Sequence, residues 1–155
     1  MLAVMGNAFV LQPDEPATKI QHDLKELRSF RSALVKDRTR IMSRLKVQTL
    51  SITCRQSKAR LAQVDRQIAE INAAIGRLIH SSDRLAHSMK ILRSIPGIGA
   101  VCAATILIEM PEIGSMDRMQ VACLTGVVPM IPQSGQWRGK SFIQVGRKVV
   151  RDALY

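Results

Sequence analysis

The chain has 155 residues and a formal net charge of +11, so it is long enough for about one domain, and its sequence pI near 10.5 favours a polyanionic partner, nucleic acid rather than membrane. Aromatic residues make up only 3% of the chain, which excludes base stacking as the main means of binding and favours phosphate contacts with a duplex. The three cysteines have no zinc-type spacing and indicate reduced thiols. The apolar residues 1–11 are too short for a membrane span and lack the basic start of a targeting signal.

The chain divides into three regions by composition. Residues 1–18 are a short N-terminal remnant or linker that ends in a Pro-Asp-Glu-Pro break, residues 19–94 are a coiled-coil arm, and residues 95–155 are shorter elements punctuated by glycine and proline. The predicted fold class is mainly α: a long antiparallel helical hairpin or coiled-coil arm, followed by a small domain that contains a helix-hairpin-helix.

The arm carries apolar residues at alternating spacings of three and four, which is typical of packed helices. A first seam contains Ile20, Leu24, Leu27, Leu34, Ile41, Leu45 and Ile52, and a second contains Leu61, Val64, Ile68, Ile71, Ile75, Leu78, Leu85, Met89 and Leu92. Arg31, Arg38 and Gln48 interrupt the first seam, which predicts a modest but specific interface. The register changes within residues 48–58, so we expect two helices folded back on each other, with one continuous helix containing a stutter as the alternative.

The arm is also strongly basic near its middle. Residues 36–60 hold one acidic side chain, Asp37, against eight basic ones: Lys36, Arg38, Arg40, Arg44, Lys46, Arg55, Lys58 and Arg60. A charge run of this kind is commonly a solvated helix face, but the local excess is larger than solubility requires. The functional interpretation is an oligomerisation arm that also contacts DNA.

A tight turn follows the arm. Pro96 ends the helical pattern, Gly97 and Gly99 permit a tight turn, and residues 100–110 predict a second helix with small residues for close packing. Two helices joined by Pro-Gly-Ile-Gly form a helix-hairpin-helix, whose free amides can hold a phosphate oxygen without regard to base sequence. Pro96, Gly97, Ile98 and Gly99 are therefore predicted DNA-binding residues, and an ordinary packing corner is the alternative.

The next segment predicts a short helix and then an exposed serine. Asp117 can cap a helix over residues 118–125 that Gly126 closes, and residues 127–129 are extended. Ser134 then stands before Gly135, and the following tail is cationic. The predicted phosphate-binding residues of this segment are Gly135, Arg138, Lys140, Arg147, Lys148 and Arg151. The pattern favours attack on a phosphodiester by Ser134, and an ordinary turn serine is the alternative.

The groups that would activate such a serine are missing from its surroundings in the sequence. No histidine follows His87, and His22, His80 and His87 are expected on the surface of the arm. Glu109, Glu112 and Asp117 are expected to be helix-end and cap residues rather than metal ligands. We therefore predict no metal site and no cofactor in this chain, and expect any activating carboxylates to come from another segment or chain.

The last third of the chain resembles the insertion-sequence-110-type transposases. The resemblance covers about residues 85–155, and its order of blocks is specific: residues 95–99, then Ala104, Glu109, Met110, Glu112, Ile113 and Gly114, then residues 124–129, 133–135, 139–140, 146–147 and 151–155. The usual Gly-Leu-Ala-Pro block reads Gly-Val-Val-Pro at residues 126–129. The arm is similar to the linker of that family.

The resemblance implies movement of an insertion sequence, with Ser134 as the catalytic serine and a phosphoserine intermediate. It also implies a RuvC-like N-terminal domain with four acidic residues that bind magnesium, a dimer or tetramer, duplex DNA and an element-encoded bridging RNA as partners, and a cytoplasmic, nucleoid-associated bacterial location. The chain departs from the family because the acidic domain and the usual final helices are absent, so we expect a copy truncated at both ends and inactive alone.

A non-catalytic, basic coiled-coil protein that binds nucleic acid is the alternative. A membrane-surface arm is disfavoured because no basic amphipathic stretch carries Trp or Phe.

Overall fold

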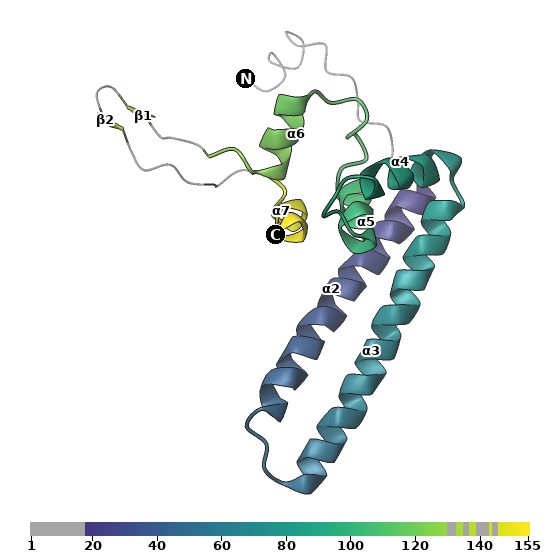
Figure 1. Cartoon of the computed structure of the whole chain (residues 1–155), viewed down its shortest axis with the longest axis vertical. Coiled ribbons are helices and arrows are strands. Elements are labelled where there is room, and N and C mark those ends of the chain that lie inside the picture. Colours follow the sequence, from purple (N-terminus) through teal and green to yellow (C-terminus); the bar gives the residue numbers. More distant parts are fainter. Residues whose placement is uncertain (1–17, 130–132, 135–136, 139–142, 144–145) are drawn as a thin grey trace, which may run out of the picture.

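The computed structural model describes residues 18–129, 133–134, 137–138, 143 and 146–155. These residues form six helices and one pair of two-residue strands. Two long helices lie antiparallel and make an arm, and the shorter helices gather at one end of it (Figure 1). The predicted fold class, a helical arm followed by a small helical domain, is confirmed.

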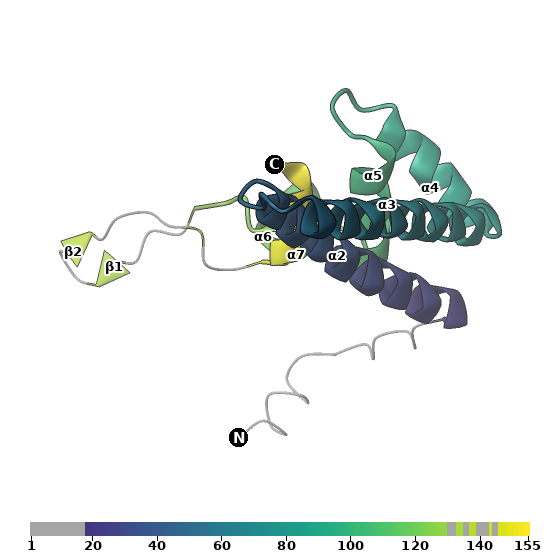
Figure 2. The ribbon, with the colours of Figure 1, turned by 90° about the horizontal axis from the view of Figure 1, so that it is seen from below.

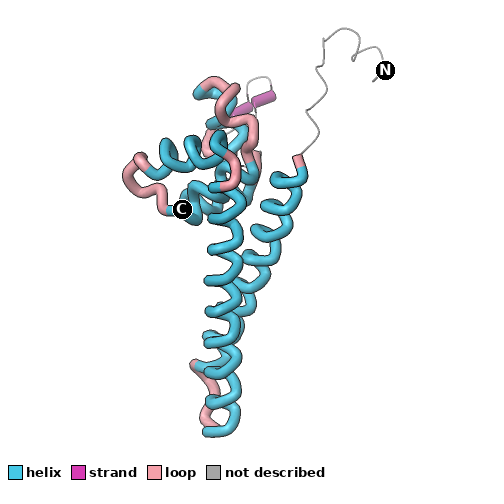
Figure 3. Tube along the Cα trace, turned by 90° about the vertical axis from the view of Figure 1, so that its right-hand side faces the viewer, coloured by secondary structure: helices cyan, strands magenta, loops and turns pink. Residues whose placement is uncertain are grey.

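The arm consists of α2 (Lys19–Leu45) and α3 (Ser51–His80). Thr18 begins α2 with a capping box, in which its hydroxyl accepts from the Gln21 amide and the Gln21 side chain accepts from the Thr18 amide. The helices run side by side along most of their length (Figure 3). Their connection spans residues 46–50, slightly before the predicted 48–58, so Ile52 lies on α3 and is 58% exposed. Its assignment to the first seam was wrong, because the chain turns before reaching it.

The two seams bury each other inside the arm. Leu34, Ile41 and Val64 form one buried cluster between α2 and α3. Two of the three polar interruptions of the first seam are paired across the arm: Arg31 Nε donates to Asn72 Oδ1 at 2.6 Å, and Arg38 Nε lies 2.7 Å from Asp65 Oδ1. These directional contacts favour one alignment of α2 on α3, as the prediction of a specific interface requires. The third, Gln48, lies in the connection between the helices, and its buried Oε1 has no hydrogen-bond partner.

The second seam does not run through one helix. Helix α3 ends at His80, and α4 (Asp83–Arg93) starts after a break at Ser81 and Ser82. Ser82 stands at the N-cap with extended backbone, and Asp83 places a carboxylate in the first turn, where the helix dipole favours it. The prediction of only two helices up to residue 94 was therefore wrong, and α4 is a separate element beside α5.

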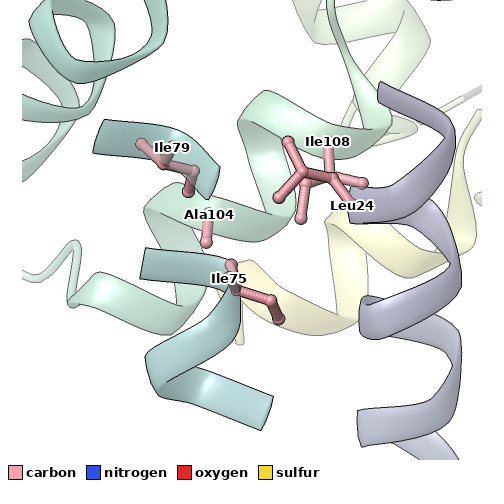
Figure 4. Packing of buried hydrophobic residues seen from close by; sticks show 5 residues of the cluster. All are labelled: Leu24, Ile75, Ile79, Ala104 and Ile108. Carbon is pink, nitrogen blue, oxygen red and sulfur yellow. The ribbon is translucent and has the colours of Figure 1, made fainter. Parts of the chain in front are cut away.

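The junction between the arm and the small domain is formed by a buried apolar cluster. Helix α5 (Ala100–Glu109) brings Ala104 and Ile108 against Leu24 of α2 and against Ile75 and Ile79 of α3 (Figure 4). Ile79 is 0% exposed. The small side chain of Ala104 lets α5 approach α3 closely, as the sequence predicted.

The remaining elements follow α5. Helix α6 (Arg118–Thr125) has Asp117 as its N-cap and Gly126, at φ 69°, as its C-cap, so this predicted helix is confirmed at both ends. Strands β1 (Gln133–Ser134) and β2 (Trp137–Arg138) pair at a distance from the helical body (Figure 2). Helix α7 (Lys148–Leu154), which the sequence did not predict, returns to α5 and buries Val150 against Ile106 and Met110.

Candidate nucleic-acid interface and serine segment

The turn between α4 and α5 exposes its backbone as the hairpin prediction requires. Pro96, Gly97 and Gly99 are exposed, and Gly97 has φ 88°, a left-handed conformation that a glycine adopts without strain. Ile98 instead packs its side chain toward the cluster of Ile106, Met110 and Val150. Ile98 thus anchors the turn on the small domain while its neighbours face outward.

The first turn of α5 is open to an anion. Gly99 is its N-cap and has no side chain to accept from the helix amides. The first amides of a helix have no acceptor within the helix, and they point outward at its positive end. The last turn of α4 adds Lys90 and Arg93 nearby in sequence. This arrangement can hold a phosphate oxygen, although the DNA-binding assignment of residues 96–99 stays a prediction.

Ser134 lies on β1, in an antiparallel pair with β2. In this register Ser134 faces Trp137 and Gln133 faces Arg138, with residues 135 and 136 connecting the strands. Gly135 and Lys140, both predicted phosphate contacts, lie outside the described residues, as do the side chains of Ser134 and Arg138. The described backbone therefore places the serine at the end of β1, opposite Trp137 of β2, and its catalytic role stays a prediction.

The described cations of the tail have partners within the protein. Arg147 Nη2 lies 2.5 Å from Glu112 Oε1, and Arg147 Nη1 donates to the Glu109 carbonyl. Lys148 Nζ pairs with Asp152 at 2.5 Å, one helical turn away, and Arg151 Nη1 donates to the Gly126 carbonyl at 3.4 Å. Sequence could not reveal the Arg147 contacts, because 38 residues separate Arg147 from Glu109.

The acidic side chains near the tail do not fit a magnesium site. Glu109 Oε1 lies 2.8 Å from Arg28 Nε, as an ion pair without hydrogen-bond alignment, and Glu112 is paired with Arg147. Asp117 is occupied in capping α6. Among the described residues, no three His, Cys, Asp or Glu side chains cluster closely enough to hold a metal ion.

The ion pair with Arg147 also changes the acidity of Glu112. Partial burial by itself raises the pKa of this carboxyl, but the hydrogen bond and charge of Arg147, the Glu112 backbone amide and the charge of Lys25 together outweigh burial. The pKa is therefore held below its ordinary value, which favours the ionised form of Glu112 that pairs with Arg147.

A cationic groove lies near the α2–α3 connection of the arm. Figure 1 shows this connection at the opposite end of the arm from α4 and α5. The groove is an open hollow of about 470 Å³ between α2 and α3, and its lining combines three arginines with polar side chains: Arg44, Arg60, Arg66, Gln56, Gln63 and Ser57. No acidic residue lines it. Arg66 lies beyond the basic run of residues 36–60, so the sequence pattern did not indicate it.

Comparison with known proteins finds a family match for one part of the chain. Residues 89–155 match the family described as transposase IS116/IS110/IS902, a stretch that begins within α4 and continues through α5, α6 and α7. No curated protein matches the chain. None of the helices described is both long and apolar enough to cross a membrane.

Proposed function

We propose that the chain takes part in DNA transposition and that Ser134 is its nucleophile. The premise is that residues 89–155 match the transposase IS116/IS110/IS902 family. The observation that supports the proposal is the position of Ser134 on β1, beside the two-residue connection to β2, within the matched residues. The sequence around it is cationic, which suits a phosphodiester substrate.

The proposed step is an in-line displacement at phosphorus. The Ser134 oxygen bonds to phosphorus as the bond to the departing deoxyribose oxygen breaks, the serine proton leaves to a base, and the departing oxygen takes up a proton. The phosphodiester energy is kept in the serine–phosphate bond for a later ligation. Because arginines engage Glu109 and Glu112 and a helix cap engages Asp117, we propose that the activating, magnesium-binding carboxylates come from an acidic domain supplied in cis or in trans.

The test is covalent trapping. The chain is incubated with labelled duplex DNA and magnesium, with and without an acidic magnesium-binding domain of the same family. We expect a DNA–protein adduct only with that domain, lost in Ser134→Ala and kept in the matched variant Ser141→Ala. An adduct formed by the chain alone would contradict the need for supplied carboxylates, and an adduct in Ser134→Ala would remove Ser134 as the nucleophile.

A second proposed role is nucleic-acid binding by the arm, which would stand even without catalysis. The groove of Arg44, Arg60 and Arg66 carries no acidic lining residue and suits a phosphate backbone. We expect Arg60→Gln and Arg66→Gln each to reduce the slope of log affinity against log salt by about 1. Lys19→Gln, at the opposite end of α2, should change it less. Equal effects from all three would mean that overall charge, rather than the groove, binds nucleic acid.

The same titration compares two proposed partners. Duplex DNA and an RNA hairpin of equal charge are measured against the same variants, since the resemblance implies both DNA and a bridging RNA. Binding of neither, or a response independent of salt, would contradict the electrostatic proposal. A nucleoid-associated location is proposed with this function.

Self-association is proposed on narrower grounds than the sequence implied. Because the two seams bury each other within the arm, they no longer require a partner. Exposed apolar side chains at the α2–α3 connection support an oligomer instead: Val47 is 79% exposed, Leu50 is 66% exposed and Ile52 is 58% exposed. We expect light scattering to show a dimer or larger species that Leu50→Ser weakens. A monomer at high concentration would contradict this proposal.

A further inference from the structure

We propose that Arg147 is a positioning residue that closes the base of the segment carrying Ser134, rather than a residue that contacts DNA. The proposal rests on the proposed role of Ser134. The segment in question, residues 127–145, follows the end of α6 and precedes α7. In this proposal Arg147, together with Gly126 and Gly146, holds the two ends of the segment together.

The contacts of Arg147 join three parts of the small domain. Its guanidinium reaches the Glu112 carboxylate, with Nη2 and Oε1 2.5 Å apart, and the Glu109 carbonyl at the end of α5. Its backbone amide donates to the Leu124 carbonyl of α6 at 2.7 Å. One residue therefore ties the start of α7 to α5 and α6 at once. A DNA-binding arginine would instead leave its guanidinium directed at the solvent.

Two glycines make the closure possible. Gly146 has φ 102°, and a Cβ built on it would lie 2.4 Å from the Gly126 nitrogen and 2.9 Å from the Leu124 carbonyl oxygen. The two backbones thus pass each other closer than any side chain would permit. Arg151 adds a hydrogen bond to the Gly126 carbonyl at 3.4 Å. The segment that contains Ser134 consequently starts and ends at one point.

This closure is anchored to the core of the small domain. Val150 of α7 is 0% exposed and packs with Ile106 of α5 and with Met110, the C-cap of α5. Fixing both ends of a connecting segment reduces the space that its middle can explore, and small displacements of a nucleophile cost large factors in rate. Arg147 therefore limits where β1, and with it Ser134, can lie relative to the α4–α5 turn.

Glu112 separates the two interpretations of Arg147. If Arg147 contacts DNA, Glu112→Gln removes a competing negative charge and strengthens binding. If Arg147 closes the segment, Glu112→Gln loosens the segment and gives no gain in DNA affinity beyond that of Glu70→Gln, which removes the same charge from an exposed site on α3. One titration therefore distinguishes the two interpretations by whether Glu112→Gln binds DNA more tightly than Glu70→Gln does.

The segment of residues 127–145 contains a natural fluorescent probe, Trp137. Trp137 is the only tryptophan of the chain and faces Ser134 in the strand pair, so its fluorescence anisotropy reports motion of the segment in the full chain without any need for catalysis. We expect Glu112→Gln, Arg147→Lys and Gly146→Ala each to lower the Trp137 anisotropy at a temperature where far-UV circular dichroism shows the helices intact. Lysine retains the positive charge but cannot reach both Glu112 and the Glu109 carbonyl at once, so Arg147→Lys should not restore the Trp137 anisotropy of the original protein.

The controls are matched to each change. Gly97 has φ 88° but nothing within 4 Å of a built Cβ, so Gly97→Ala carries the same backbone strain as Gly146→Ala without the collision, and it should leave Trp137 anisotropy unchanged. Should Gly146→Ala fail to fold, Glu112→Gln, the mildest change, decides alone. Unchanged Trp137 anisotropy in Glu112→Gln, or tighter DNA binding than Glu70→Gln, overturns the proposal. Ser134→Ala lowers adduct formation but not anisotropy, so failure of the serine proposal remains distinguishable.

Discussion

Replacing Ile79 by alanine tests the junction that fixes the small domain on the arm. Ile79 stands near the end of α3, is 0% exposed, and belongs to the cluster with Leu24 of α2 and Ile108 of α5 (Figure 4). Its side chain is therefore shared by the arm and by the helix that follows the α4–α5 turn. Loss of its contacts should weaken the whole molecule rather than one helix.

The expected cost follows from the atoms removed. The change deletes three buried carbons at roughly 0.8 kcal/mol each, or about 2.4 kcal/mol of transfer free energy. Three helices surround the site and cannot all collapse into the space, so a cavity contribution raises the loss in unfolding free energy to about 3–4 kcal/mol. That is a large fraction of the ~5–15 kcal/mol typical of a folded domain.

The assay is urea unfolding followed by far-UV circular dichroism. The matched control is Ile91→Ala on α4, which deletes the same atoms from a side chain that is 54% exposed; we expect it to cost less than about 1 kcal/mol. A fall of under about 1 kcal/mol for Ile79→Ala, or equal falls for both variants at equal m-values, would refute the packing described for the junction.

Three further predictions concern single sites. Gly76 lies within α3 with nothing within 4 Å of a built Cβ, so Gly76→Ala should stabilise the helix by about 0.5–1 kcal/mol, and an unchanged urea midpoint would contradict this. Because folding lowers the pKa of Glu112, the ionised carboxylate adds to the free energy of unfolding above the ordinary carboxyl pKa, and this contribution is lost as the pH falls through the lower pKa of the folded state. The free energy of unfolding should therefore fall less steeply at acidic pH in Glu112→Gln than in the original protein, as measured by urea unfolding over a range of pH. Burial raises the pKa of the Cys102 thiol, whereas Cys123 is exposed, so a thiol reagent near pH 8 should modify Cys123 first, and equal rates would argue against the packing of α5.

Local signals account for much of what could be predicted. Helix α6 begins after Asp117 and ends at Gly126, as its sequence indicated, because a capping side chain and a left-handed glycine act within a few residues of the helix they bound. The α4–α5 turn follows from Pro96 and Gly97 for the same reason. A comparable signal at Ser82 and Asp83 marked the start of α4, but the apolar spacing continues across the break and concealed it.

The candidate site was predicted unevenly. Sequence identified Ser134 and the cationic tail but assigned Arg147 to DNA, because a charge pattern along the chain contains no information about which carboxylate will lie opposite. The groove at the loop end of the arm was only partly visible, since Arg66 joins Arg44 only when α3 folds back on α2.

By itself the sequence determined the helical class, the two seams, the capped helix α6 and the resemblance of the last third to a transposase family, since each depends on periodicity or on residues close together in the chain. Only the tertiary structure decided that the seams bury each other, that Arg28 and Arg147 reach Glu109 and Glu112, and that Gly146 passes against Gly126. These contacts join residues about 20 to 80 positions apart. Which residues meet depends on how α2, α5, α6 and α7 pack together. That packing is driven by the burial of side chains such as Ile79, Met110 and Val150, and not by the local conformational preferences of the chain.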